Sequence, residues 1–168
     1  TARDIIGENE IGGIVQDEPL LADGEVHFCG MPIAVVVATS EGLARKAAKK
    51  ITAEIEPLEV VTDARVAAAN GDLIVPPKKF VLGETTNAFA NCAHVFEGKT
   101  DQNGQEHLYI ETQGAYAVPT ENGGMKVYSS TQGPTAVQRA VCRVTGLAMH
   151  EVEVDVQRLG GGFGGKED

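Results

Sequence analysis

The chain has 168 residues, of which 42% are hydrophobic and 23% are charged, and its net charge is −10 at neutral pH. This composition is that of an ordinary globular protein. Because the chain lacks the basic stripe that binds phosphates, we expect no nucleic-acid partner. Its strongest apolar run, Ile33 to Ala38, is far shorter than the roughly 18 residues of a membrane span, which predicts no membrane partner.

The cysteines and histidines are scattered along the chain. Three cysteines occur without CxxC spacing, and four histidines occur without HxH or HxxxH spacing. Reduced thiols in a cytoplasmic protein are therefore favoured over disulfides. The same pattern predicts that no metal ion is held directly by protein side chains.

The first 70 residues predict an α/β unit. Residues 33–38 are rich in β-branched side chains and predict a buried strand. Ser40 is placed to cap a helix that begins at Glu41, and the alternating residues 51–56 predict a second strand. Thr62 and Asp63 precede a short helix that the following Asn-Gly pair ends.

Residues 71–90 carry two adjacent prolines and no sustained periodicity, which predicts a linker between domains. In residues 91–168 the pattern predicts strands over 94–100, 107–118, 125–130 and 151–156. Between the last two, a helix is expected to begin at Pro134 and end at Gly146. The predicted fold class is therefore α+β, with an α/β unit in residues 1–70.

Both ends of the chain favour a fragment of a longer protein. The sequence begins at Thr1, and it stops just after a strand and a glycine loop, where a helix would normally follow. We therefore expect a truncated second domain.

The most unusual local feature is the loop GGGFGG, residues 160–165, which directly follows a predicted strand. Glycines permit close backbone approach and positive φ, and the exposed N–H groups can cradle an anion. Gly160, Gly162 and Gly165 also satisfy GxGxxG, so a nucleotide-binding turn is one alternative. A flexible tail is the simpler alternative, which the strand and the single large Phe163 argue against.

Two polar segments precede this loop. In GQEHLYIETQ, Glu106 and His107 could form an acid–base pair, but neighbours on a strand point to opposite faces. We therefore expect His107 to be a buried polar group that joins two strands. In SSTQ, Gln132 lies between a strand end and a helix start, where it could cap the helix or donate to a ligand, and capping is the simpler role.

Together, GQEHLYIETQ, SSTQ and GGGFGGKE resemble, in this order, the start of the molybdopterin-binding region of the xanthine dehydrogenase and aldehyde oxidase family. The upstream segment GIVQDEPLLADGEVHFCGMPIAVVVATSEGLARKAAKKI is similar to part of the hammerhead domain of that family. The resemblance covers essentially the whole chain. It implies a partial hammerhead domain over residues 1–70 and a truncated molybdopterin-binding domain over 91–168.

The resemblance implies a molybdenum ion held by a pterin cofactor and not by side chains, and oxidation of a substrate carbon with oxygen from water. It implies that Gln132 hydrogen-bonds a ligand of the metal and that the backbone of Phe163 and Gly164 lies against the cofactor. It also implies that Glu167 faces the substrate, which favours a purine over an aldehyde. The resemblance further implies 2Fe-2S clusters and FAD on other domains or subunits, which are the expected partners together with the rest of the molybdenum subunit.

The arginine and the general-base glutamate that the family uses lie further downstream, so no catalytic residue is expected in this chain and the fragment alone is expected to be inactive. The alternative hypotheses for the function are a hydroxylase of aldehydes or other N-heterocycles, a nucleotide-binding module and an inactive interaction domain. The two strand ends that carry Gln132 and Phe163–Gly164 should meet at one sheet edge, because a helical crossover joins them.

Overall fold

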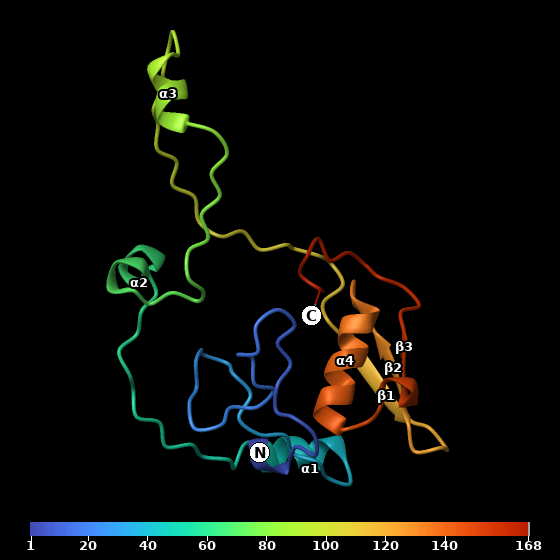
Figure 1. Cartoon of the computed structure of the whole chain (residues 1–168). Helices are drawn as coiled ribbons and strands as arrows, with labels where there is room; N and C mark the ends of the chain where they lie inside the picture. The colour runs from blue at the N-terminus through green and yellow to red at the C-terminus, as the bar shows by residue number, and fades with distance from the viewer. Residues whose placement is uncertain (168) are drawn as a thin grey trace. The chain divides into compact units, whose positions relative to one another are not determined.

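The computed structural model describes residues 1–167, which form two compact units. One unit comprises residues 1–51 together with the C-terminal part of the chain from residue 104, and the other comprises residues 52–103 (Figure 1). Helices and a mixed sheet occur side by side in the first unit, so the predicted α+β class is confirmed.

The sheet of the first unit has three strands in the order β1-β2-β3. Strands β1 (Ala115–Pro119) and β2 (Met125–Ser129) are antiparallel, and β2 pairs in parallel with β3 (Val152–Asp155). The turn between β1 and β2 is closed by the Thr120 N–H, which donates to the Gly124 carbonyl at 2.9 Å, and by Gly123 with φ 84°. The strand predicted over 125–130 is confirmed as β2.

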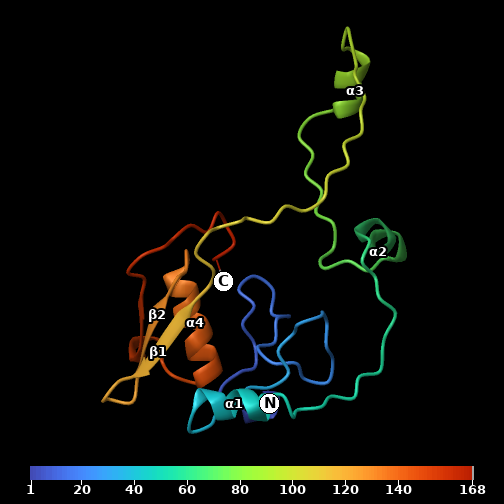
Figure 2. The same ribbon diagram turned by 180° about the vertical axis from the view of Figure 1, so that it is seen from behind.

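Helix α4 (Pro134–Thr145) is the crossover between the parallel strands and lies along one face of the sheet (Figures 1 and 2). Its bounds agree with the sequence, since proline occupies the first turn and Gly146 ends the helix with φ 76°. A short 3-10 helix, η2 (Met149–Glu151), leads into β3. Because β2 and β3 are parallel, the segments that follow them leave the sheet at the same edge.

The N-terminal part of the first unit contains η1 (Ala2–Asp4) and α1 (Glu41–Ala48). The Ser40 hydroxyl accepts a hydrogen bond from the Leu43 N–H at 3.3 Å, so the predicted cap and helix are confirmed. This part is joined to the end of α4 through the Gly7 N–H, which donates to the Val144 carbonyl at 2.9 Å.

The second unit contains α2 (Ala64–Asn70) and α3 (Thr85–Ala90). Asp63 caps α2 through the Arg65 N–H at 2.7 Å, and Gly71 ends it with φ 85°, as the sequence predicts. Helix α3 lies within the stretch 71–90 and was not predicted, because six residues are too few to show helical periodicity. The predicted domain limits 1–70, 71–90 and 91–168 stay predictions.

Several predicted strands are absent, and those predictions are wrong. Among residues 1–167, the segments 33–38, 51–56 and 94–100 form no strand. A strand is stable only when a neighbour satisfies its N–H and C=O groups, and a sequence pattern cannot supply that neighbour. Of the predicted strand 107–118, only the end forms, as β1, because only residues 115–119 pair with β2. Near the start of the predicted strand, Leu108 adopts a left-handed φ of 53°.

The described residues bury few apolar side chains, namely Leu21, Met31, Val127 and Val152. Two polar side chains are also buried, Thr131 at 3% exposure and Lys166 at 0%. Both follow strands at the same sheet edge, so the most enclosed polar region lies where the segments after β2 and β3 meet. Over residues 1–167, none of the helices combines the length and apolar content needed to cross a membrane.

Candidate functional site

The segment after β2 and the glycine loop after β3 are held together by the side chain of Gln132. Its Oε1 accepts hydrogen bonds from the Gly164 N–H at 3.0 Å and the Lys166 N–H at 3.3 Å. The predicted convergence of Gln132 with the Phe163–Gly164 backbone is therefore present. The predicted capping role of Gln132 is wrong, because Gly133 is the N-cap of α4 and no side chain caps this helix.

Backbone groups reinforce this junction. The Gln132 N–H donates to the Lys166 carbonyl at 2.7 Å, and the buried Thr131 hydroxyl donates to the same carbonyl at 3.1 Å. The Thr131 hydroxyl also accepts from the Gly133 N–H at 2.9 Å. The end of the glycine loop is thus fixed to the residues that lead into α4.

A second anchor is the side chain of Lys166, which is completely buried. Its Nζ donates to Ser130 Oγ at 2.9 Å and to Glu111 Oε2 at 3.1 Å, and it lies 5.0 Å from the centre of the Tyr109 ring. A buried ammonium is tolerated only when it is paired and hydrogen-bonded. These three partners meet that requirement.

The Glu111 carboxylate collects three donors on one oxygen. Oε2 accepts from the Gly160 N–H at 2.5 Å, from the Ser130 hydroxyl at 2.7 Å and from Lys166 Nζ. These hydrogen bonds lower the pKa of Glu111 to about 2. The bond from Gly160 has the largest effect, followed by those from Ser130 and Lys166. Glu111 is therefore ionised at neutral pH and binds both the beginning and the end of the glycine loop.

The glycines of the loop are required by the side chains that lie against them. A Cβ on Gly162 would collide with the Gln132 amide, and one on Gly160 would lie 2.5 Å from the Glu111 Cβ. A Cβ on Gly165 would lie 2.5 Å from the Tyr109 ring. The glycine pattern therefore reflects close packing within the chain itself, as well as any approach to a ligand.

Phe163 is the one residue of the loop 160–165 that is not glycine. Its φ is 53°, a left-handed conformation that is costly for a bulky residue, and 77% of its surface is exposed. Strain at an exposed aromatic residue inside a fixed loop is typical of functional sites. Phe163 thus occupies a position that packing alone does not explain.

Glu167 completes the cluster. Its carboxylate accepts from Gln132 Nε2 at 3.3 Å, and its side chain is exposed. All four predicted site residues therefore lie together, and we call the group the glycine-loop site. It comprises the loop residues 160–167, the residue Gln132 that contacts them, and the anchors of the loop, Glu111 and Ser130.

Sequence reasoning missed Lys166 as an anchor and misjudged the segment that carries His107. His107 is exposed and lies outside any strand, so the predicted buried role is wrong. Glu106 and His107 also face each other at 3.7 Å, because the strand that would separate them does not form. No pattern in the sequence marks Lys166 as an anchor. Gln113, in the same segment as His107, donates to the Gly165 carbonyl at 2.9 Å and so also contacts the loop.

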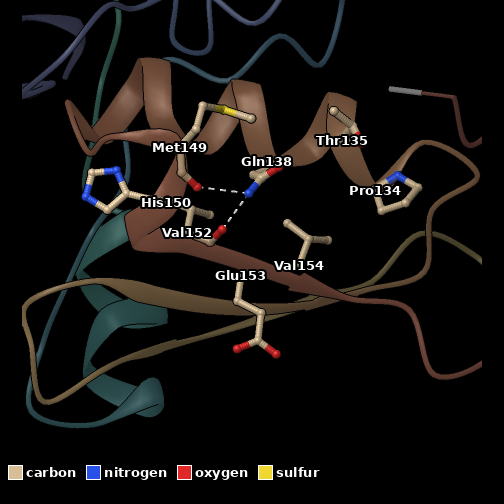
Figure 3. A pocket seen from close by; sticks show the side chains of 8 residues that line it. All are labelled: Pro134, Thr135, Gln138, Met149, His150, Val152, Glu153 and Val154. Carbon is tan, nitrogen blue, oxygen red and sulfur yellow. Dashed lines mark hydrogen bonds between the residues drawn. The ribbon is translucent and has the colours of Figure 1, made fainter.

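A pocket elsewhere in this unit lies between α4 and β3 and shares none of these residues (Figure 3). Figure 3 shows the Gln138 side chain turned toward the segment before β3. Its Nε2 donates to the carbonyls of Met149, at 2.9 Å, and Val152, at 2.7 Å. Gln138 therefore fixes η2 and the start of β3 to α4, which is a structural role.

The glycine-loop site suits a pterin-held metal. Among residues 1–167, no group of three or more His, Cys, Asp or Glu side chains is arranged to hold a metal ion. The site instead offers the Gln132 amide and the exposed backbone of Gly164, beside the exposed Phe163. Such groups can pack against a cofactor and hydrogen-bond it without binding the metal themselves.

Comparison with known proteins agrees with this interpretation. A family model described as the molybdopterin cofactor-binding domain matches residues 69–168. A second, the a/b hammerhead domain of aldehyde oxidase and xanthine dehydrogenase, matches residues 1–59. The fold is thus that of a molybdopterin cofactor-binding domain preceded by hammerhead-domain sequence. The chain belongs to the aldehyde oxidase and xanthine dehydrogenase family, and the predicted resemblance is confirmed.

Individual relatives are named as xanthine dehydrogenases and aldehyde oxidases. A xanthine dehydrogenase of Blastobotrys adeninivorans is 44% identical over 91% of this chain and 11% of its own length. Aldehyde oxidase 2 of Cavia porcellus is 37% identical over 99% of this chain and 12% of its own. The structure of the aldehyde oxidoreductase from Desulfovibrio gigas superposes with a TM-score of 0.80 at 28% identity, over 98% of this chain and 20% of that one. The chain spans about a tenth of the length of the curated relatives it matches.

Proposed function

We propose that this chain is part of the molybdenum subunit of a hydroxylase that oxidises purines with oxygen from water. The observation that carries the proposal is the convergence of Gln132, Gly164 and Glu167, at 3.0 and 3.3 Å, beside the exposed Phe163. The net reaction takes a substrate C–H and water to C–OH, two protons and two electrons. When bound, the molybdenum–molybdopterin group supplies the oxidising equivalents for this reaction.

In this proposal the residues of this chain bind and orient the cofactor and the substrate. The Gln132 amide would hydrogen-bond the cofactor through Nε2, because its Oε1 is already occupied by the loop N–H groups. The Phe163–Gly164 backbone would lie against the cofactor. Glu167 would accept a hydrogen bond from a ring N–H of the substrate, and its exposure leaves it accessible.

The purine assignment depends on Glu167, since a ring N–H offers the carboxylate a donor that an aldehyde lacks. A relative named aldehyde oxidase matches the chain nearly as well as one named xanthine dehydrogenase. Oxidation of aldehydes or other N-heterocycles is therefore the alternative that a substrate comparison must address.

Nucleotide binding by the GxGxxG pattern is disfavoured by the contacts of the loop. The N–H groups of Gly160 and Gly164 already donate to Glu111 and Gln132. A phosphate cradle needs such N–H groups to be free.

We further propose that the remainder of the molybdenum subunit, 2Fe-2S clusters and FAD on other domains or subunits act with this chain in the cytoplasm, and that this chain is inactive alone. Many large apolar side chains of the described residues are exposed, such as Ile14, Val37, Phe80 and Phe96. Exposure on this scale supports the view that further protein packs against them.

The deciding experiment uses the full-length protein. We expect the purified protein to contain molybdenum and a pterin, and to oxidise hypoxanthine or xanthine faster than benzaldehyde. Oxygen from labelled water should appear in the product. A full-length protein that carries no pterin would contradict the proposal, and a preference for the aldehyde would replace the purine assignment by its alternative. The 168-residue chain, assayed in parallel, should show no turnover.

A further inference from the structure

The glycine loop is closed by a single carboxylate oxygen. Glu111 Oε2 accepts from the Gly160 N–H, where the loop begins, and from Lys166 Nζ, where it ends. The segment between these two anchors contains Phe163 and Gly164, and Glu167 follows directly. The ion pair therefore determines how tightly the loop curves.

Lys166 is connected to the site in two ways. Its side chain points to Glu111, Ser130 and the Tyr109 ring, while its backbone N–H and C=O bond the side chain and the backbone of Gln132. Because the side chain is fully buried, it has little freedom to move without moving the backbone. A change at Nζ is thus transmitted to Gln132 and Glu167.

We propose that the Lys166–Glu111 ion pair is a positioning device, which closes the loop of residues 160–166 and thereby sets the places of Gln132 and Glu167. Neither residue needs to touch cofactor or substrate in this role. The inference rests on the proposed function for its effect on turnover, but its effect on the loop is independent of it.

The test uses Lys166→Met in the full-length protein, since methionine fills a similar volume without the charge. Lys126→Met is the matched control: this lysine pairs with Glu153 at 2.8 Å across β2 and β3 and contacts no loop residue. The first readout is amide hydrogen exchange in protein freed of cofactor. We expect exchange at Gly160, Gly164 and Lys166 to accelerate by roughly tenfold or more in Lys166→Met and to stay unchanged in the control.

Faster exchange that is limited to the loop distinguishes a positioning role from a general loss of stability. A positioning role leaves exchange in β2 and α4 unchanged, whereas a merely structural role accelerates exchange throughout the unit. Equal acceleration everywhere, or none in the loop, would overturn the proposal. If Lys166→Met does not fold, Glu111→Gln takes its place. Its amide keeps an acceptor oxygen for the Gly160 N–H, so in this variant the faster exchange is expected at Gly164 and Lys166.

The second readout is turnover. In Lys166→Met we expect kcat/KM for the purine to fall roughly 10- to 100-fold, as misplaced groups typically cause, while molybdenum and pterin content is retained. Glu111→Gln should lose less, and the double variant should lose no more than Lys166→Met alone, because both act through one contact. A loss of kcat/KM in the double variant equal to the product of the two single losses would contradict action through one contact. If the wild-type protein proves inactive, the proposed function fails, and the exchange measurement still decides the role of the pair.

Discussion

Gln132 and Gly164 lie 32 positions apart, yet the side-chain oxygen of one accepts the backbone N–H of the other at 3.0 Å. The contact exists because β2 and β3 are parallel neighbours joined by α4, so the segments that follow them leave the sheet at the same edge. Gln132 Nε2 also donates one hydrogen bond to Glu167 at 3.3 Å, so this side chain is the centre of the glycine-loop site.

The first prediction concerns Gly162. In Gly162→Ala the new methyl group collides with the Gln132 amide, which must turn away and release the Gly164 and Lys166 N–H groups. We expect the full-length protein to lose about 1–3 kcal/mol of unfolding free energy and much of its cofactor. Denaturant titration and pterin fluorescence measure the two effects.

Gly114→Ala is the control for that experiment, because a Cβ on Gly114 meets nothing within 4 Å and its φ is not positive. This substitution should leave stability and cofactor content unchanged. If the two alanine variants behave alike, the packing of Gly162 on Gln132 does not matter.

The second prediction concerns Gln132 itself. Gln132→Ala removes the acceptor of two loop N–H groups, so hydrogen exchange at Gly164 should accelerate and cofactor content should fall. The control is Gln138→Ala, whose amide bonds only Met149 and Val152. It should destabilise the region of η2 without changing exchange at Gly164, and equal cofactor loss in both variants would argue against a role of Gln132 in binding.

The third prediction is a pH dependence that arises from Glu111. The folded pKa is lowered from 4.5 to about 2, so the carboxylate stabilises the folded state fully above pH 4.5. This contribution declines as the pH falls from 4.5 toward about 2, where the folded protein also takes up the proton. Unfolding free energies of wild type and Glu111→Gln should therefore converge over that range, and a constant difference would show that Glu111 is not the titrating anchor.

Much of the first unit could be predicted from the sequence. The bounds of α1 and α4 follow from Ser40, Pro134 and Gly146, which act within a turn of their own position. The meeting of Gln132 with the loop also follows, because a strand–helix–strand pattern constrains where the strand ends lie.

Other features depend on partners that a linear pattern does not reveal. Residues 33–38 have strand-like side chains, but no neighbouring strand among the described residues pairs with them. The burial of Lys166 depends on Glu111, 55 positions earlier, and a lysine after a glycine loop is exposed in most proteins. Lys166 could therefore be recognised only from the structure.

The last prediction concerns Glu167 and the class of substrate. Replacement of this residue by leucine in the full-length protein should weaken purine turnover while molybdenum and pterin content is retained, because the side chain is exposed and contributes only one long hydrogen bond to the site. Loss of a hydrogen bond to a bound ring costs about 1–3 kcal/mol, which corresponds to roughly a tenfold to hundredfold fall in kcat/KM. Aldehyde oxidation should fall less or even rise, since an aldehyde offers no ring N–H to the carboxylate. Parallel kinetics with hypoxanthine and benzaldehyde measure the difference, and Glu121→Leu in the turn between β1 and β2 serves as a control for the removal of an exposed acidic side chain. An equal loss on both substrates would remove Glu167 from substrate recognition, because a residue that only supports the fold or the cofactor cannot distinguish a purine from an aldehyde.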